Sequence, residues 1–305
     1  MLTAAADRYL ALRRGLGHRL VQTGLFLRSF TRFAEDGGDT HVHSQRVLEW
    51  AVATGSTPLA RGIRLRTVAR FAAFLHAEDP KHELPPAGIF PTRTRRQPPY
   101  IYTSSEIGRL LDAAGQLHRT YPLRRSTYIA LVGLIACTGL RISEALGLRM
   151  LDIEPDCSTI LVRMGKFGKS RRVPLHPTAA DALGRYVASR RDINTADQHL
   201  FLSAGGRRIS RSMANYTFRT IARNAGIDTG RARSCRIHDL RHTFATRSLE
   251  RCAADSGSVA EHFVALSTYM GHADIKHTYW YFEATPELMA GMAQAAESTA
   301  RKMAT

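Results

Sequence analysis

The sequence predicts a mainly helical protein with a small β-hairpin insert, an α+β arrangement in two domains. Its 305 residues suit about two ordinary domains. Apolar residues recur at helical spacing in both halves, and a proline-rich segment separates the halves. Because 44% of the residues are hydrophobic, the chain can bury a sizeable core and is not expected to be disordered.

Residues 1–90 are predicted to form a small helical domain. One apolar stripe recurs every three or four residues and indicates a helix; it consists of Leu65, Val68, Ala72 and Leu75. A second stripe runs through residues 25–36. Both stripes predict amphipathic helices.

A linker is predicted over residues 84–102, LPPAGIFPTRTRRQPPYIY. Proline at this density prevents a helix and stiffens an extended segment. The prolines of this segment are Pro85, Pro86, Pro91, Pro98 and Pro99. We therefore place the domain boundary here.

The second domain, residues 103–284, is predicted to be helical around one hairpin. TSSE at 103–106 has the pattern of a capping box at a helix start. In 158–175, a β-branched run, a turn rich in glycine and lysine, and a second short run predict two antiparallel strands. A Thr-Pro pair then starts a further helix, so that residues 285–305 form a C-terminal helical tail.

A strong excess of positive charge runs through the chain. The net charge is +17 and the pI about 10.5, and 38 of the 43 basic residues are arginine. Such an excess favours a polyanionic partner, and nucleic acid is the first candidate. The basic residues that either contact DNA or form ordinary solvated surface are Arg64, Arg66, Arg70, Arg93, Arg95, Arg96, Lys169 and Arg171.

The protein is expected in the cytoplasm, associated with the nucleoid. Its longest apolar stretch, 128–140, is shorter than the ~20 residues that a membrane-spanning helix needs. The N-terminus has no signal-peptide pattern. The four cysteines show neither paired metal spacing nor a disulfide framework, which is typical of reduced thiols. We expect no membrane association, no metal and no cofactor.

Four separated segments collect side chains that suit phosphate chemistry. ACTGLRISEALGLRMLDI places Arg141 near a helix start, and IHDLRHTFATRSL places His238 and Arg241 three residues apart on one helix face. The hairpin turn carries Lys166, and TYMGHADIKHTYWYF carries His272 with two tyrosines. Each residue alone has an ordinary structural explanation. Their joint presence in a basic chain favours a functional site.

These segments resemble, in the same order, the sequence boxes of the tyrosine recombinases, the phage-integrase family. TGLRISEALGL is similar to the first arginine box, GKFGKSRRVPL to the hairpin lysine segment, HDLRHTFAT to the His-x-x-Arg box and MGHADIKHTYWY to the nucleophile segment. The resemblance implies a two-domain, C-shaped DNA clamp whose first domain is a SAM-like core-binding domain. It implies double-stranded DNA with specific recombination sites as partner, bound by a dimer to tetramer of this protein, with or without sister recombinases.

The resemblance also implies the reaction and the role of each residue. A site-specific recombinase, integrase or transposase cuts and rejoins DNA strands through a 3′-phosphotyrosine link, without metal or ATP. Arg141 and Arg241 would bind the phosphate, and Lys166 would protonate the departing oxygen. His238 and His272 would assist in proton handling and phosphate binding.

The registry of the family separates neighbouring candidates. Its nucleophile lies nine residues past the histidine, which from His272 is Tyr281. Tyr279 lies seven residues past His272, out of register, and is expected to pack or lie near DNA. Of the two lysines in the hairpin turn, Lys166 at the first corner matches the family's lysine better than Lys169.

Three residues beside these boxes have two interpretations each. Glu144 and Asp239 either orient the arginines and His238 or act as helix-cap or surface carboxylates. His242 either supports the site or belongs to the core.

Two other functions compete with recombination. A regulator of the same fold would bind DNA without cutting it, and a type IB topoisomerase would share the tyrosine chemistry. FEATPEL, the ending after Tyr281, resembles that of recombinases from transposons and integrative elements. The tail 285–305 either docks on a neighbouring protomer or packs on its own domain. Residues 250–266 are part of a stretch that is longer than in compact family members.

Overall fold

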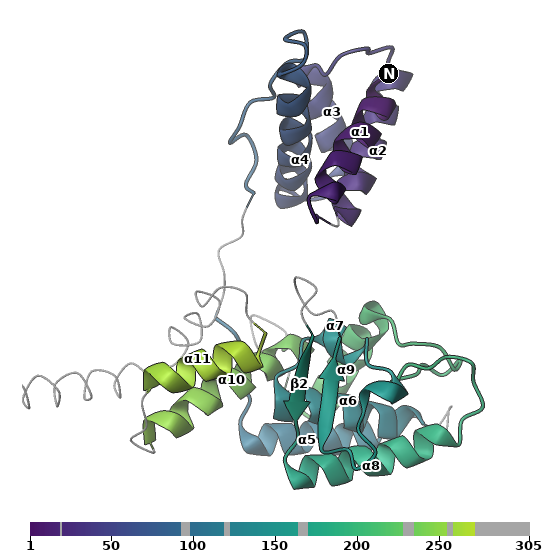
Figure 1. Cartoon of the computed structure of the whole chain (residues 1–305), viewed down its shortest axis with the longest axis vertical. Helices are drawn as coiled ribbons and strands as arrows, with labels where there is room; N and C mark the ends of the chain where they lie inside the picture. The colour runs from purple at the N-terminus through teal and green to yellow at the C-terminus, as the bar shows by residue number, and fades with distance from the viewer. Residues whose placement is uncertain are drawn as a thin grey trace, which may run out of the picture. The chain divides into compact units, whose positions relative to one another are not determined.

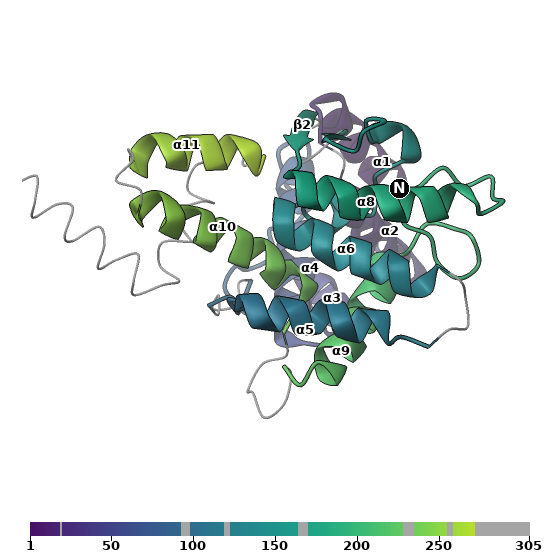
Figure 2. The ribbon, with the colours of Figure 1, turned by 90° about the horizontal axis from the view of Figure 1, so that it is seen from below.

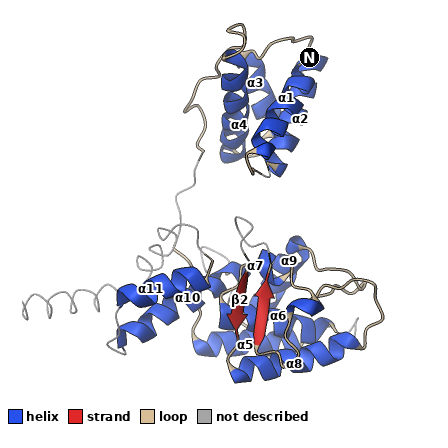
Figure 3. Cartoon of the chain, viewed as in Figure 1, coloured by secondary structure: helices blue, strands red, loops and turns tan. Residues whose placement is uncertain are grey.

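The computed structural model describes residues 1–18, 20–92, 98–118, 123–163, 170–227, 235–254 and 259–271. The chain divides into two compact units, the first from Met1 to Gln97 and the second beginning at Pro98 (Figure 1). The described part is mostly helical with one small two-stranded sheet, as the sequence predicts (Figure 3). None of its helices is both long enough and apolar enough to cross a membrane.

The first unit is a group of helices around one apolar core. Its elements are α1 (Leu2–Gly15), α2 (Val21–Asp36), α3 (Ser44–Thr54) and α4 (Pro58–His76). α4 begins after Thr57, whose hydroxyl accepts a hydrogen bond from the Ala60 N–H at 3.2 Å, and Pro58 suits the first turn. The predicted apolar stripe of α4 is buried, together with Phe30 and Trp50 from α2 and α3.

The arginines of α4 differ in their surroundings. Arg66 and Arg70 are exposed one helical turn apart. The Arg64 guanidinium instead lies over the Phe26 ring, 4.8 Å from its centroid, and donates to the Ala60 carbonyl at 3.3 Å. Arg66 and Arg70 therefore keep the exposure that a DNA contact needs, whereas Arg64 is engaged within the unit.

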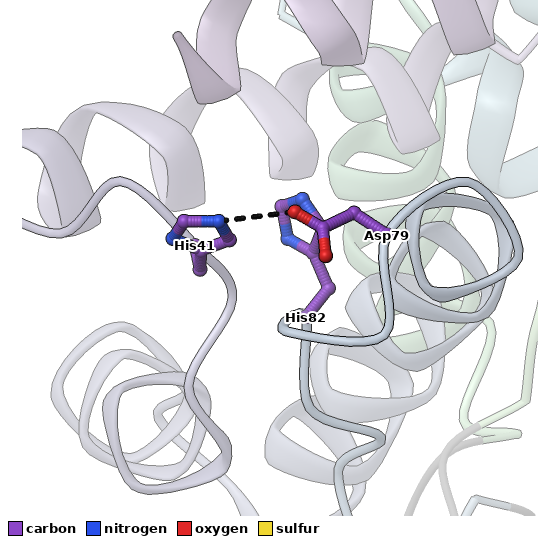
Figure 4. A group of neighbouring side chains, drawn as sticks. All are labelled: His41, Asp79 and His82. Atoms are coloured by element: carbon purple, nitrogen blue, oxygen red, sulfur yellow. Dashed lines mark hydrogen bonds and ion pairs between the residues drawn. The ribbon is translucent and has the colours of Figure 1, made fainter.

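Histidines and carboxylates join the loop before α3 to the turn after α4 (Figure 4). The His41 and Asp79 side chains point toward each other, with Nε2 and Oδ2 3.3 Å apart. The Val42 N–H donates to His82 Nδ1 at 3.1 Å, and the Glu83 N–H donates to the Val42 carbonyl at 2.8 Å. These bonds tie the segment before α3 to the turn after α4.

The second unit is built around α6 (Figure 2). Its helices are α5 (Ser104–Gly115), α6 (Arg124–Thr138), α7 (Ile142–Ala145), α8 (Pro177–Arg191), α9 (Arg211–Asn224), α10 (Ile237–Ala254) and α11 (Val259–Tyr269), with a 3-10 turn at Met150–Asp152. α6 packs against α5, α8 and α10, and its buried side chains include Leu131 and Ile135. The predicted capping box is present at the start of α5, with Thr103 and Glu106 bonding reciprocally.

A hairpin sheet lies beside these helices. β1 (Thr159–Val162) pairs antiparallel with β2 (Arg171–Pro174), and Val162 faces Arg171 at the end toward the turn. The strands confirm the predicted hairpin. The turn that carries Lys166 and Lys169 lies outside the described residues.

α10 and α11 pack together as a helical pair at one side of the unit (Figures 1 and 2). Their small core includes Leu249, Phe263 and Met270. α10 is tied to the start of the unit, because the Tyr102 N–H donates to Thr243 Oγ1 at 3.0 Å and Arg247 donates to the Tyr102 carbonyl. These bonds fix the helix that carries the His-x-x-Arg box.

Candidate active site

The Thr-Gly pair before Arg141 ends one helix and starts the next. Gly139 follows α6 in a left-handed conformation, with φ of 62°, and Arg141 is the extended N-cap residue of α7. A side chain at Gly139 would meet the Phe244 ring at 2.5 Å and the Met270 sulfur at 2.9 Å. Glycine therefore satisfies both the backbone angle and the packing. The turn at this glycine places Arg141 beside the end of α11.

The two predicted phosphate-binding arginines meet at the carboxyl end of α11. Arg241, on α10, is 2% exposed and donates to the Gly139 carbonyl and, at 2.9 Å, to the Met270 carbonyl. Arg141 donates to the next carbonyl, that of Gly271, at 3.0 Å. Residues 100 positions apart in the sequence thus contact adjacent peptide groups.

Glu144 is a buried carboxylate between two arginines. It accepts hydrogen bonds from the Arg141 N–H at 3.0 Å and from Arg141 Nη1 at 2.8 Å. The Arg171 guanidinium approaches it with both terminal nitrogens, at 3.1 and 3.0 Å. Burial by itself would raise the pKa of Glu144, but the hydrogen bonds and charge of Arg171, followed by those of Arg141, lower this pKa to about 2. Glu144 both caps α7 and holds the Arg141 side chain.

The two histidines of α10 lie edge to face, with His238 and His242 ring centroids 4.9 Å apart. Burial is the main cause that lowers the pKa of each to about 4. The positive charge of Arg241 contributes next for His238, and the neighbouring His238 contributes next for His242. Both imidazoles are therefore neutral near pH 7, and a neutral His238 has one ring nitrogen with which to accept a proton.

Asp239 is fully buried at the start of α10. It accepts the Arg236 N–H at 3.0 Å and pairs with the Arg236 guanidinium at 2.8 Å. These contacts are those of a helix-cap carboxylate, one of the two interpretations that the sequence left open.

Arg171 differs from what the sequence suggests. The sequence places it among basic residues that either contact DNA or form ordinary solvated surface, yet its side chain is only 17% exposed. Besides the two bonds to Glu144, its Nε donates to the Tyr269 carbonyl at 2.8 Å. The partners lie 27 and 98 positions away, so local sequence could not reveal them.

The structure thus brings together Arg141, Glu144, Arg171 and Arg241, and His238 lies on α10 one helical turn from Arg241. The remaining site and DNA-contact candidates lie outside the described residues: Lys166, Lys169, His272, Tyr281, Arg93, Arg95 and Arg96. So do Tyr279 and the tail 285–305.

A second polar cluster lies in the first unit, where ligand atoms of His41, Asp79 and His82 are all within 4.8 Å of one another (Figure 4). Its hydrogen bonds favour a structural role. His82 Nδ1 accepts the Val42 N–H, so the neutral ring carries its proton on Nε2 and has no further lone pair for a metal. Burial, together with the nearby His41, also lowers the pKa of His82.

Comparisons with known proteins identify the family of this chain. Residues 101–287 match the Phage integrase family. The putative integrase/recombinase y4rB of Sinorhizobium fredii is 36% identical over 293 residues, 93% of either chain. The tyrosine recombinase XerD of Brucella abortus is 30% identical over 78% of this chain and 76% of its own length. The solved Tn1549 transposon integrase, in complex with transposon right-end DNA, matches with a TM-score of 0.63 and 18% identity over 99% of both chains, which shows the fold.

The family match and the curated relatives define a tyrosine recombinase. The match over 101–287 covers more than half of the sequence, and the chain belongs to the phage integrase family.

Proposed function

We propose that this protein is a site-specific DNA recombinase, acting as an integrase or transposase, that cuts and rejoins strands through a covalent 3′-phosphotyrosine. The observation that carries the proposal is that Arg241 and Arg141 donate to two consecutive carbonyls, those of Met270 and Gly271 respectively. That point lies directly before His272 and ten residues before Tyr281. A phosphate bound by these arginines would therefore lie beside a segment that reaches the proposed nucleophile within ten residues.

The arginines suit the charge that develops in the reaction. Attack on a phosphodiester places additional negative charge on the non-bridging oxygens. Guanidinium groups hold such oxygens with charge-assisted, paired hydrogen bonds that strengthen as the charge grows. Arg141 is positioned by Glu144 and its side chain is 20% exposed, so it is arranged before DNA arrives, whereas Arg241 is buried in the described part of the unit and its contact with a phosphate is assigned by the family pattern.

The remaining steps are assigned to residues by the family pattern. The Tyr281 phenol, whose ordinary pKa is about 10, loses its proton to the neutral His238, and its oxygen attacks phosphorus. The bond to the 5′-oxygen breaks, and Lys166 protonates that oxygen, while His272 binds the phosphate. The covalent link conserves the bond energy, so rejoining by the reverse steps needs neither ATP nor a metal ion.

The partner is double-stranded DNA carrying specific recombination sites, bound by a dimer to tetramer of the protein. Structural relatives include a lambda integrase tetramer bound to a Holliday junction, which supports the assembly proposed here. A non-catalytic regulator is disfavoured, because such a protein has no need for a tyrosine in register with His272. A type IB topoisomerase is disfavoured by the full-length similarity to curated integrases and recombinases.

A covalent-trapping experiment tests the proposal. A binding site selected from a pool of random-sequence duplexes is rebuilt with a nick, so that the strand released by cleavage diffuses away. Wild-type protein should then give a covalent protein–DNA band on a denaturing gel, without added metal or ATP. Tyr281→Phe should abolish the band, because it lacks the attacking oxygen.

Tyr279→Phe is the matched control and should retain the band. The reverse pattern would place the nucleophile at Tyr279 and refute the registry. Persistence of the band in both variants would refute tyrosine catalysis at this segment. A requirement for a divalent metal in the wild-type reaction would refute the metal-free mechanism.

A further inference from the structure

We infer that Arg171 is a positioning residue of the strand-transfer site, which holds Glu144 and the turn before His272 in one arrangement rather than contacting DNA. The inference rests on the proposed function, in which Arg141 binds the scissile phosphate. It assigns a role to a residue at the start of β2 that the chemistry above does not use.

Each of the three nitrogens of the Arg171 guanidinium donates a hydrogen bond to the protein. Nη1 and Nη2 donate to the two oxygens of Glu144 at 3.1 and 3.0 Å, a paired geometry that fixes the carboxylate plane. Nε donates to the Tyr269 carbonyl at 2.8 Å. One side chain thus links the hairpin, α7 and the last residue of α11.

The same side chain packs on Gly271. This glycine has φ of 66°, and a Cβ placed on it would lie 2.9 Å from Arg171 Nη1 and 3.2 Å from Cζ. The guanidinium therefore occupies the space where a side chain would stand, directly before His272. The positive φ and this close approach together explain a glycine at position 271.

The contacts form a continuous path to the phosphate-binding group. Arg171 holds Glu144, Glu144 accepts two hydrogen bonds from Arg141, and Arg141 donates to the Gly271 carbonyl. Three consecutive carbonyls, Tyr269 to Gly271, are thereby bound by Arg171, Arg241 and Arg141 in turn. Loss of Arg171 would loosen both Arg141 and the peptide that leads to His272.

The neighbouring residue provides a matched control. Arg172 pairs with Glu154 on the other side of the strand, and its side chain is 74% exposed. In the covalent-trapping assay at saturating DNA, Arg171→Met should reduce the cleavage rate by about 10- to 100-fold, as expected for displacement of a catalytic group by up to ~1 Å. Arg172→Met should react like the wild type. Arg171→Lys should lie between, because an ammonium replaces the charge but not the paired geometry.

A pH profile separates positioning from a general loss of structure. The charged groups that face Glu144 are Arg141, from the start of α7, and Arg171, from β2. Without Arg171 the Glu144 carboxyl should protonate at a pH higher by about 1–3 units, which moves the acidic limb of the cleavage profile upward. Adding Glu144→Gln should remove that displacement, because an amide does not titrate.

Several results would overturn the inference. One is a cleavage rate for Arg171→Met within twofold of the wild type. Another is an unchanged cleavage rate at saturating DNA together with weaker DNA binding. In that case the slope of log affinity against log salt concentration would be smaller by about 1, which indicates a lost phosphate contact. A carboxyl ¹³C NMR titration of Arg171→Met without DNA gives an independent test, with Arg171→Lys as the substitute if the methionine variant does not fold. An unchanged midpoint for Glu144 would exclude its contact with Arg171. Lack of any covalent product from wild-type protein would count against the proposed function, whereas the NMR result would still decide the role of Arg171.

Discussion

Replacing Glu144 with glutamine should destabilise the second unit strongly, and the loss should depend on pH. Glutamine is nearly isosteric and keeps an oxygen for the Arg141 N–H. It removes the negative charge that lies between the Arg141 and Arg171 guanidinium groups, where the Glu144 side chain is only 5% exposed. Two partly buried cations then lose their counter-ion, which is the costly way to break such a pair.

The size of the effect follows from the pKa of Glu144, which lies at about 2 instead of its ordinary 4.5. At ~1.36 kcal/mol per pH unit, this difference corresponds to about 3 kcal/mol of unfolding free energy at pH 7. Because the folded state holds this proton less tightly than the unfolded state, the contribution is complete above pH 4.5 and disappears as the pH falls toward 2. At pH 3.5 it should have decreased to about 2 kcal/mol.

Urea unfolding followed by circular dichroism at pH 7 and pH 3.5 measures both values. Glu154→Gln is the control, because Glu154 pairs with Arg172 at the surface and should contribute less than about 1 kcal/mol. A loss below about 1 kcal/mol for Glu144→Gln at pH 7 would contradict the buried-pair argument. A loss that is the same at both pH values would show that the carboxylate charge is not its cause.

Two further predictions concern the same region. Gly139→Ala should destabilise the protein by about 1–3 kcal/mol, since φ is 62° and the new methyl group would meet Phe244 at 2.5 Å. Gly205→Ala, at an exposed position with open space, should change the unfolding free energy by no more than ~0.5 kcal/mol in the same assay. Equal losses of stability in the two variants would refute the argument. In NMR titrations of the DNA-free protein, His238 should change charge near pH 4, so that acidification from 6.5 to 4 destabilises the fold; a midpoint at or above 6.5 would show that burial does not control its protonation.

The sequence was sufficient for the features that local patterns encode. The apolar stripe of α4, the capping box of α5 and the hairpin strands each follow from residues close together in the chain. The placement of Arg141 also follows from local chemistry, because a glycine after a helix and a carboxylate three residues on define the next helix start.

Long-range contacts were beyond the same reasoning. Arg171 and Arg172 are adjacent and identical, yet strand alternation sends one toward Glu144 and the other toward solvent. Which of the two points inward depends on how the hairpin packs on α7 and α11, and no local pattern specifies that packing. For the same reason Glu144 had two interpretations, and the structure shows that both its cap and its side-chain contacts are made.

The row of carbonyls at the end of α11 has an electrostatic consequence. Arg141, Arg171 and Arg241 carry three positive charges, and Glu144 supplies one negative charge, so these four side chains sum to +2. The carbonyls orient the guanidinium groups without cancelling their charge, since a peptide group is a dipole with no net charge. A DNA phosphate bound by Arg141 would therefore meet a donor that is already aligned, within a cluster of side chains that is still electropositive. Little reorientation energy would then be needed as the transition state forms.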